Sequence, residues 1–212
     1  MLEILIQEKH YSDRKILENI QVSIPKNGLY GVVGKNGAGK TTFFKCLSGL
    51  TPFKGKVRYC ERGLMPEDIV FLPTEPYLYE HLTVAEFYTF FRLLLGIKPE
   101  EAMPFEVDKT LLIRELSTGM RKKVYCNAVL QKPYTLYIFD EPFNGLDITS
   151  ALHIKQLLNK LAANHIVLIA SHILETLQTC EKIYLIHDKS IQTFLPSELN
   201  AIEEILMLMC FT

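Results

Sequence analysis

Apolar and polar positions alternate with two periods along this chain, and the change of period separates expected strands from expected helices. Residues 2–8 and 21–24 have the alternation of half-buried β-strands, with a polar turn at 12–15 between them. Short continuous apolar runs, which are typical of buried strands, occupy residues 29–33, 69–72, 136–139 and 166–170. Further strand patterns, the last two forming an expected hairpin, occur at 56–59, 182–186 and 190–194.

Helical periodicity follows most of these runs. The expected helices cover residues 43–50, 83–95, 117–130, 147–163 and 174–180, with a last one starting at Ser197. Thr83 and Glu86 have the spacing of a capping box, and Gly96 ends that helix. Asp147 or Thr149 is expected to cap another. Strands alternating with helices in the middle, and strand pairs near both ends, predict a mixed α/β fold.

Length and charge narrow the class of protein. A chain of 212 residues without repeats, low-complexity tracts or a flexible linker is expected to form a single domain over residues 1–212. Its formal net charge of −1 and pI near 6.6 give no argument for nucleic-acid binding. The short basic run Arg121-Lys122-Lys123 lies in a helical pattern and is interpreted as a solvated helix face.

Cysteine usage and apolar runs predict where the protein works. The five cysteines are scattered without a C-x-x-C pair, which indicates reduced thiols rather than disulfides or a zinc site. No stretch approaches the about 20 apolar residues that cross a bilayer, and residues 1–4 lack a signal-peptide pattern. A cytoplasmic protein is therefore expected, with any membrane part supplied by another chain.

The candidate chemistry begins with a glycine-rich run between an apolar run and a helical pattern. This phosphate-binding P-loop consists of Gly34, Lys35, Asn36, Gly37, Ala38, Gly39, Lys40, Thr41 and Thr42. Its glycines allow the backbone to wrap closely around phosphate oxygens with the N–H groups pointing inward. Lys40 is expected to reach the β- and γ-phosphates, and the Thr41 hydroxyl to ligate Mg²⁺. The chain is therefore predicted to bind a nucleoside triphosphate.

A pair of carboxylates follows the apolar run at 136–139. Asp140 is expected to hold Mg²⁺ through water, and Glu141 to polarise the attacking water as a general base. The alternative, a turn and helix cap at Asp140-Glu141-Pro142, does not explain the P-loop upstream.

Four further short segments accompany the P-loop and the carboxylates. They are Tyr11, Leu116-Ser117-Thr118-Gly119-Met120, Asn144-Gly145-Leu146-Asp147 and Ala170-Ser171-His172. Taken alone, Ser117 is an ordinary helix cap, and a lone histidine is more often structural. In this order and company, the segments resemble the adenine-stacking aromatic, the signature, the D-loop and the switch histidine of the ATP-binding cassette (ABC) ATPases. The resemblance covers essentially the whole chain.

The resemblance implies a P-loop NTPase core of ABC type. That fold has an antiparallel β portion at its N-terminus and a small helical subdomain, at about residues 77–132 here. ATP and Mg²⁺ are the implied cofactors. The backbone amides of residues 36–42 and Lys40 would hold the phosphates, and Thr41 and Asp140 the metal.

The resemblance also implies catalytic roles and partners. Glu141 would activate water, His172 would contact the γ-phosphate, and Tyr11 would stack on adenine. Ser117 and Gly119 would face the γ-phosphate of a second nucleotide-binding subunit, identical or different, so that two chains close head to tail around two ATP molecules. Separate transmembrane permease subunits would bind the chain to the inner face of the membrane, and no nucleic acid is implied.

The sequence departs from the family pattern at several positions. Thr74 stands where the family has a glutamine that contacts Mg²⁺, so that contact is an open question. The following Glu75 is either a metal ligand or merely exposed, and exposure is the preferred interpretation. Thr118 and Met120 replace a glycine and a glutamine of the commonest signature. The apolar residues Phe87, Tyr88, Phe90, Phe91 and Leu94 are interpreted as core of the helical subdomain.

Three hypotheses of function follow. The first is an ATP-hydrolysing subunit of an ABC transporter, with export favoured over import. The second is a non-transport ABC ATPase, such as an iron–sulfur assembly ATPase. The third is a module that binds ATP without hydrolysing it, which the absence of the glutamine at position 74 supports and Glu141 and His172 oppose.

Overall fold

The structure, a computed structural model, describes residues 1–98 and 103–208. Its strands form two sheets. The smaller sheet is antiparallel, in the order β2-β1-β4-β5. Its strands are β1 (Leu2–Tyr11), β2 (Arg14–Ile24), β4 (Lys54–Tyr59) and β5 (Arg62–Gly63). The expected first strand pair is therefore confirmed, and the hydrogen-bonded ladder extends it by several residues beyond the alternating pattern.

The larger sheet has the strand order β10-β9-β3-β8-β7-β6. Its strands are β3 (Gly28–Val33), β6 (Ile69–Leu72), β7 (Leu136–Asp140), β8 (Ile166–Ala170), β9 (Lys182–His187) and β10 (Ser190–Phe194). All neighbours are parallel except β9 and β10, which form the expected antiparallel hairpin. The apolar runs of the sequence became these parallel strands because helices cover both faces of the sheet.

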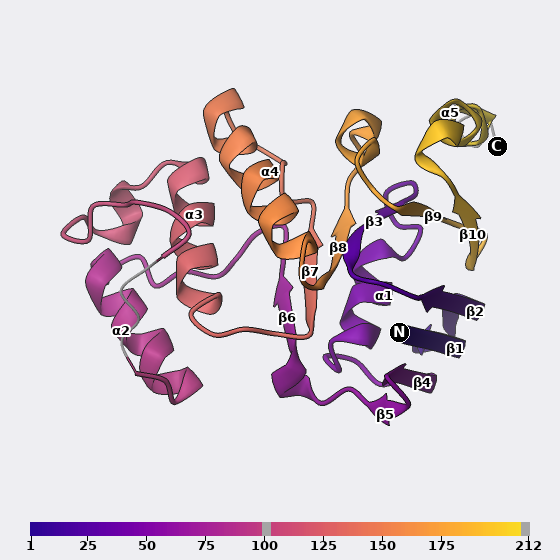
Figure 1. The fold of residues 1–212 in the computed structure, drawn as a ribbon, viewed down its shortest axis with the longest axis horizontal. Coiled ribbons are helices and arrows are strands. Elements are labelled where there is room, and N and C mark those ends of the chain that lie inside the picture. Colours follow the sequence, from indigo (N-terminus) through magenta and orange to yellow (C-terminus); the bar gives the residue numbers. More distant parts are fainter. Residues whose placement is uncertain (99–102, 209–212) are drawn as a thin grey trace.

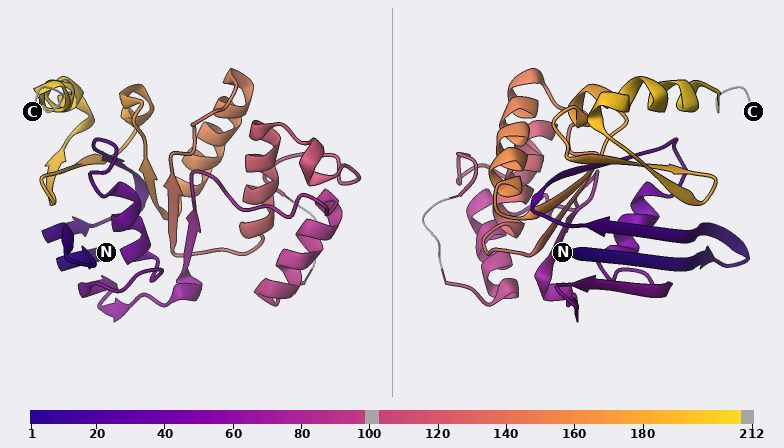
Figure 2. Two further views of the ribbon diagram at one scale, coloured as in Figure 1. Left: turned by 180° about the vertical axis from the view of Figure 1, so that it is seen from behind. Right: turned by 45° about the vertical axis from the view of Figure 1, so that its right-hand side comes forward.

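The helices are α1 (Lys40–Leu47), α2 (Val84–Leu95), α3 (Thr118–Val129), α4 (Ile148–Ala162) and α5 (Leu199–Leu208). In Figure 1, α1 lies between the two sheets, α4 lies on the other side of the parallel sheet, and α2 and α3 form a separate group. From the opposite side, Figure 2 shows α5 beside the β9–β10 hairpin, far from α2 and α3. None of the helices within the described ranges is long and apolar enough to cross a membrane.

Helix caps match the sequence patterns closely. Thr83 accepts a hydrogen bond from the Glu86 N–H and Glu86 bonds back to the Thr83 N–H, so the capping box is formed. Gly96 ends α2 in the left-handed conformation. Of the two candidate caps for α4, the structure selects Asp147.

Two expected helices are corrected. The segment expected as a helix at 174–180 is a short 3₁₀ helix, Leu174–Leu177, because the chain must turn back at once into β9. The last helix starts at Leu199 rather than at Ser197. Pro196 instead opens a 3₁₀ turn, Pro196–Glu198, before it.

Three apolar clusters hold these layers together. The first lies between the antiparallel sheet, α1 and one face of the parallel sheet, and includes Phe43 and Phe44. The second fills the other face of the parallel sheet, beneath α3, α4 and α5. The third packs α2 against α3. Cys126 of α3 belongs to the second cluster and Val124 to the third, so α3 is shared between the parallel sheet and the helical group.

The aromatic residues of α2 divide between core and surface. Phe87 and Tyr88 are buried, which confirms the expectation, and Phe91 packs partly against the same cluster. Phe90 and Leu94 are exposed, at 39% and 67%. The prediction that the whole set forms core is wrong for these two, because they lie on the outer face of a helix covered on one side only.

The basic run at 121–123 is also corrected. It does not form a solvated helix face, because Lys122 is buried at 9% exposure and its neighbours are half-buried. Arg121 is held by an ion pair with Glu80, at 3.2 Å. The charge of Lys122 therefore lies inside the protein.

Candidate functional site

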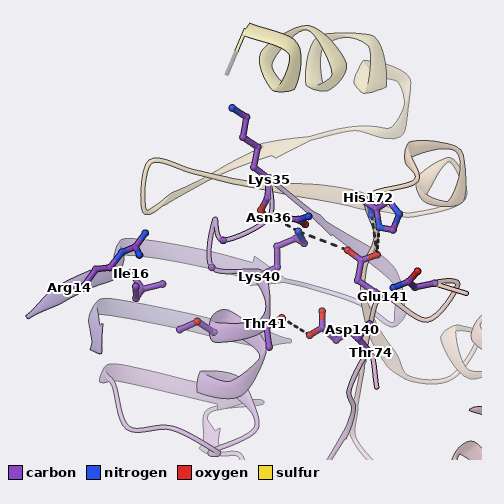
Figure 3. A pocket seen from close by; sticks show the side chains of 14 residues that line it. Arg14, Ile16, Lys35, Asn36, Lys40, Thr41, Thr74, Asp140, Glu141 and His172 are labelled. Carbon is purple, nitrogen blue, oxygen red and sulfur yellow. Dashed lines mark hydrogen bonds and ion pairs between the residues drawn. The ribbon is translucent and has the colours of Figure 1, made fainter. Parts of the chain in front are cut away.

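Three neighbouring strands of the parallel sheet bring the candidate site together. Register pairs Val32 of β3 with Ala170 of β8, and Ala170 with Asp140 of β7. Because parallel strands end at the same edge of a sheet, the P-loop, the carboxylates and His172 all leave that edge side by side. Figure 3 shows Lys40, Glu141 and His172 converging there, beside a hollow of about 550 Å³.

The P-loop backbone is shaped by glycines. Gly37 has φ +81° and Gly39 φ +112°, conformations that side chains rarely adopt. A Cβ on Gly39 would lie 2.9 Å from Leu17 Cδ2. α1 begins directly at Lys40, so the loop ends at the N–H groups of a helix N-terminus. The loop therefore has the shape and the donors of an anion cradle.

The side chain of Lys40 packs against the backbone of this loop. Its side chain is 9% exposed, and Nζ donates to the carbonyl oxygen of Gly34 at 2.8 Å and to that of Lys35 at 3.4 Å. The same ammonium lies 3.9 Å from Glu141 Oε1. These contacts place a cation at the floor of the hollow, between the loop and the carboxylates.

Thr41 and Asp140 form a second contact across the site. The Thr41 hydroxyl donates to Asp140 Oδ2 at 2.6 Å, while Asp140 Oδ1 is buried without a hydrogen-bond partner among the described residues. Burial raises the pKa of Asp140, although the Thr41 bond opposes that effect. A hydroxyl beside a buried carboxylate with an unused oxygen fits a hard cation such as Mg²⁺, which takes oxygen ligands.

Asp140→Asn is expected to make the metal-free protein more stable, by about 1 kcal/mol. The pKa of Asp140 is higher in the folded chain than in the unfolded chain, so the ionised carboxylate costs folding energy at neutral pH. That cost disappears as the pH falls below the unfolded value. Urea unfolding in EDTA at neutral pH measures the change, and a less stable variant would contradict this account of the site.

The Glu141 carboxylate lies between His172 and Lys40. Its Oε2 lies 2.7 Å from Nδ1 of His172 and accepts the backbone N–H of the same residue at 3.2 Å. Its backbone has φ +52°, in the left-handed region that non-glycine residues seldom occupy. A strained backbone with a carboxylate held from both sides is typical of a functional position.

The structure places most of the predicted P-loop residues on the wall of the hollow. The lining consists of Arg14, Ile16, Lys35, Asn36, Gly37, Gly39, Lys40, Thr41, Thr42, Thr74, Asp140, Glu141, Asn144 and His172. Gly34 contributes through the carbonyl that Lys40 holds, and Ala38 packs under the loop beside the apolar core. Glu75 is exposed, as preferred, and Thr74 lies on the wall.

Sequence reasoning did not single out Arg14 and Ile16. They stand two residues apart on β2 and therefore share one face of the strand, which meets the hollow. This two-residue spacing on a strand was the sequence signal that could have identified both residues. Tyr11, by contrast, is outside the lining. It is 44% exposed, and the Lys9 ammonium lies 4.2 Å from the centre of its ring.

Ser117 and Gly119 do not join the hollow of their own chain. Ser117 caps α3 by accepting the Met120 N–H at 3.3 Å. Gly119 packs closely against α4, where an added Cβ would lie 2.7 Å from Ser150 Oγ. Both stand outside the lining of the nucleotide hollow.

The parallel sheet, the P-loop and the carboxylates at one sheet edge define a nucleoside-triphosphate-binding protein of the P-loop class. The family model described as "ABC transporter" matches residues 17–144, and the chain belongs to this family. It is an ATP-binding, ATP-hydrolysing subunit, and subunits of this kind work with transmembrane permease components.

Curated relatives cover nearly the whole chain. The chain is 31% identical to the "Uncharacterized ABC transporter ATP-binding protein YthP" of Bacillus subtilis (strain 168), over 96% of this chain and 89% of that protein. It is also 31% identical to the lipopolysaccharide export system ATP-binding protein LptB of Acidithiobacillus ferridurans, over 87% and 86%. The lantibiotic transport ATP-binding protein SrtF of Streptococcus pyogenes is 29% identical, over 84% and 82%.

Solved structures agree on the fold. A structure described as the ATP binding subunit of an ABC transporter superposes with a TM-score of 0.80 at 24% identity, covering 97% of this chain and 94% of that chain. The cbiO1 protein of Clostridium perfringens, part of the transporter complex cbiONQ, gives 0.79 at 22% identity, covering 96% and 92%. The predicted fold class is therefore confirmed.

Proposed function

We propose that this chain drives transport as one half of an ATP-dependent clamp. Two nucleotide-binding subunits close head to tail around two ATP molecules beneath separate transmembrane subunits, and hydrolysis opens them. The names of the relatives favour transport over the alternative of an iron–sulfur assembly ATPase. Membership of an ATP-hydrolysing family does not favour a module that only binds ATP.

The proposed roles follow from the contacts at the sheet edge. The loop amides and Lys40 hold the phosphates, while Thr41 and Asp140 hold Mg²⁺, whose chemistry is to neutralise phosphate charge. Glu141 accepts a proton from the water that attacks the γ-phosphate, while the bond between the γ-phosphorus and the bridging oxygen breaks and ADP leaves. His172, on the far side of that carboxylate, positions it and contacts the γ-phosphate.

Two further residues complete the proposed site. Thr74 lies on the wall and offers a hydroxyl to the metal through water, in place of the longer glutamine. Tyr11 stacks on adenine in this proposal, with the Lys9 ammonium supporting the ring from one side.

One observation supports the proposed clamp of two subunits. At the N-terminus of α3, Ser117 and Thr118 are exposed and Gly119 is buried beside them, and this helix end stands outside the hollow of its own chain. A helix N-terminus with a serine hydroxyl favours a negatively charged group. We assign that group as the γ-phosphate held by the second subunit, which makes each site a composite of two chains.

A permease contact is proposed at the helical group. Beside α2 lies a hollow of about 770 Å³ whose wall includes Tyr77, Tyr79 and Phe90. Tyr77 is 77% exposed and Tyr79 43% exposed, which is unusual for large apolar side chains. An aromatic-lined hollow of this kind suits an apolar segment of a membrane subunit. Export is the proposed direction, and its support is the export function in the name of LptB.

Ser117→Asp tests the clamp without removing the helix cap. Aspartate caps helices as well as serine does, so the monomer should fold and bind ATP with unchanged affinity. A carboxylate facing the partner's γ-phosphate should lower hydrolysis by about tenfold or more at saturating ATP. Ser117→Asn, a neutral cap of the same size, should retain activity within about threefold.

The two substitutions together decide between a composite site and a simple cap. Equal activity of the aspartate and asparagine variants would mean that no phosphate approaches Ser117. Weaker ATP binding by the Ser117→Asp monomer would mean that Ser117 belongs to the hollow of its own chain. Phosphate release and equilibrium binding of a fluorescent ATP analogue supply the two readouts.

A further inference from the structure

Lys122 is a buried lysine that the nucleotide hollow does not use. It stands on α3, is 9% exposed and lies outside the lining of the hollow. Its Nζ donates to the backbone carbonyl oxygens of Asn144, Glu141 and Pro142, at 2.8, 3.2 and 3.4 Å. An ammonium has three N–H donors and no acceptor. The three carbonyls therefore match its full donor set.

These carbonyls belong to the bend that follows β7, defined here as residues 141–144. Glu141 enters the bend with φ +52°, and its N–H donates to the Ala170 carbonyl at 3.1 Å. The Asn144 N–H closes the turn on the Glu141 carbonyl at 3.2 Å. A conformation of this kind persists only where the surrounding structure holds it. Lys122 supplies a charged anchor for the three carbonyls on one side of the bend.

We propose that Lys122 is a positioning residue for ATP hydrolysis, which fixes the backbone of the 141–144 bend and so aims the carboxylate of Glu141. The inference rests on the proposed catalytic role of Glu141. Lys122 does not touch the nucleotide hollow, so it acts on turnover through Glu141 and leaves ATP binding to the P-loop.

The Lys122 anchor lies in the N-terminal half of α3. Its N-terminus carries Ser117, which faces the second subunit's nucleotide in the proposed clamp. Gly119 packs on Ser150, and a Cβ on Gly145 would lie 3.5 Å from Thr118 Cγ2. The first turns of α3 and the 141–150 segment are therefore in direct contact at several points. Ser117 and the Lys122 anchor therefore belong to one packed unit with the bend.

The chemistry of the buried ammonium agrees with this placement. Burial lowers the pKa of Lys122, while the negative charge of Glu141 is among the effects that oppose the shift. A lysine kept in such surroundings needs hydrogen-bond partners, and carbonyl oxygens are the partners that the bend presents.

Lys122→Met removes the donors and keeps the length of the side chain. We expect kcat for MgATP hydrolysis to fall roughly 10- to 100-fold, because a catalytic group displaced by about 1 Å loses that much rate. KM and the Kd of a fluorescent ATP analogue should stay within about twofold. Lys122→Gln keeps two amide donors, so its kcat should lie between the two, about threefold below the unsubstituted chain.

Lys123→Met is the matched control. It makes the same change one position along the helix, at a half-buried side chain for which no hydrogen bond or ion pair is found within the described ranges. Its kcat should stay within about twofold. If Lys122→Met does not fold, Lys122→Gln serves as the test. We expect it to lose about threefold in kcat without a change in Kd.

An unchanged kcat in a folded Lys122→Met variant would overturn the inference. So would a parallel loss of kcat and ATP affinity that Lys122→Gln does not relieve, since that pattern describes a purely structural lysine. Normal hydrolysis by Glu141→Gln would instead overturn the role of Glu141. An inactive Glu141→Gln beside a fully active Lys122→Met would refute the inference on Lys122 alone.

Discussion

Glu141→Gln is expected to lower steady-state ATP hydrolysis by about 10²-fold or more while ATP affinity is kept, because an amide cannot accept the proton of the attacking water. Glutamine has the same size, and its oxygen still accepts the His172 N–H that Glu141 Oε2 accepts at 3.2 Å. The ion pair of Lys40 with Glu141, at 3.9 Å, is lost, which leaves more of the Lys40 charge for phosphate. The substitution therefore separates turnover from binding.

A trapped assembly is the second consequence of Glu141→Gln. If hydrolysis opens the clamp, the variant should accumulate as an ATP-bound dimer, visible by light scattering after size-exclusion chromatography. ADP should leave it monomeric. Glu175→Gln, on the short 3₁₀ helix after β8, is the matched control and should behave like the unsubstituted chain. A Glu141→Gln variant that hydrolyses ATP at the normal rate would remove Glu141 from the mechanism.

Lys40→Ala is expected to weaken ATP binding itself, by about 10- to 100-fold. Charge-assisted hydrogen bonds to phosphate contribute about 1.5–3 kcal/mol, and every 1.4 kcal/mol is tenfold in Kd. The variant also frees the Gly34 carbonyl that Lys40 holds at 2.8 Å, so the empty P-loop becomes less constrained. Equilibrium titration with a fluorescent ATP analogue measures the loss.

The control for Lys40→Ala is Lys45→Ala, which removes the same charge from the last turn of the same helix. Lys45 is half-buried and does not line the hollow, so its Kd should stay within about threefold of the unsubstituted chain. Equal losses in both variants would show that net charge, rather than contact with phosphate, accounts for the affinity.

Much of the fold could be predicted because local patterns and tertiary structure agree. The apolar runs at 69–72 and 166–170 became β6 and β8 with the expected bounds. Both ends of α2 follow from local signals, which are the capping box of Thr83 and Glu86 at its start and Gly96 at its end. Where a sequence pattern already satisfies backbone hydrogen bonds locally, the packed structure has little reason to change it.

The site was predictable to the extent that its residues adjoin in sequence. The P-loop and the Asp140-Glu141 pair each sit on a strand end, and parallel strands bring such ends together. Arg14 and Ile16 were missed because their place on the wall depends on how the antiparallel sheet packs over α1. The roles of Tyr11, Ser117 and Gly119 remain proposals, since a single chain does not present them to its own hollow.

Lys122 illustrates a different failure of sequence reasoning. Three consecutive basic residues in a helical pattern indicate a solvated face, but α3 is packed on two sides. Burial of the ammonium is tolerated because the bend after β7 offers three carbonyl oxygens as hydrogen-bond acceptors. No local pattern within residues 117–130 indicates that these acceptors are present. The burial of such a charge depends on contacts with residues far away in the sequence, and hydrophobic periodicity does not reveal these contacts.

The most direct test of the central claim is the rate of MgATP hydrolysis by the purified chain, measured over a wide range of protein concentrations. A site completed by a second copy predicts that the rate per mole of protein rises with concentration and then saturates as the dimer forms. A rate per mole that is constant down to the lowest concentration would contradict the proposed clamp, and ATP binding without any hydrolysis throughout the range would contradict a clamp made of two copies of this chain.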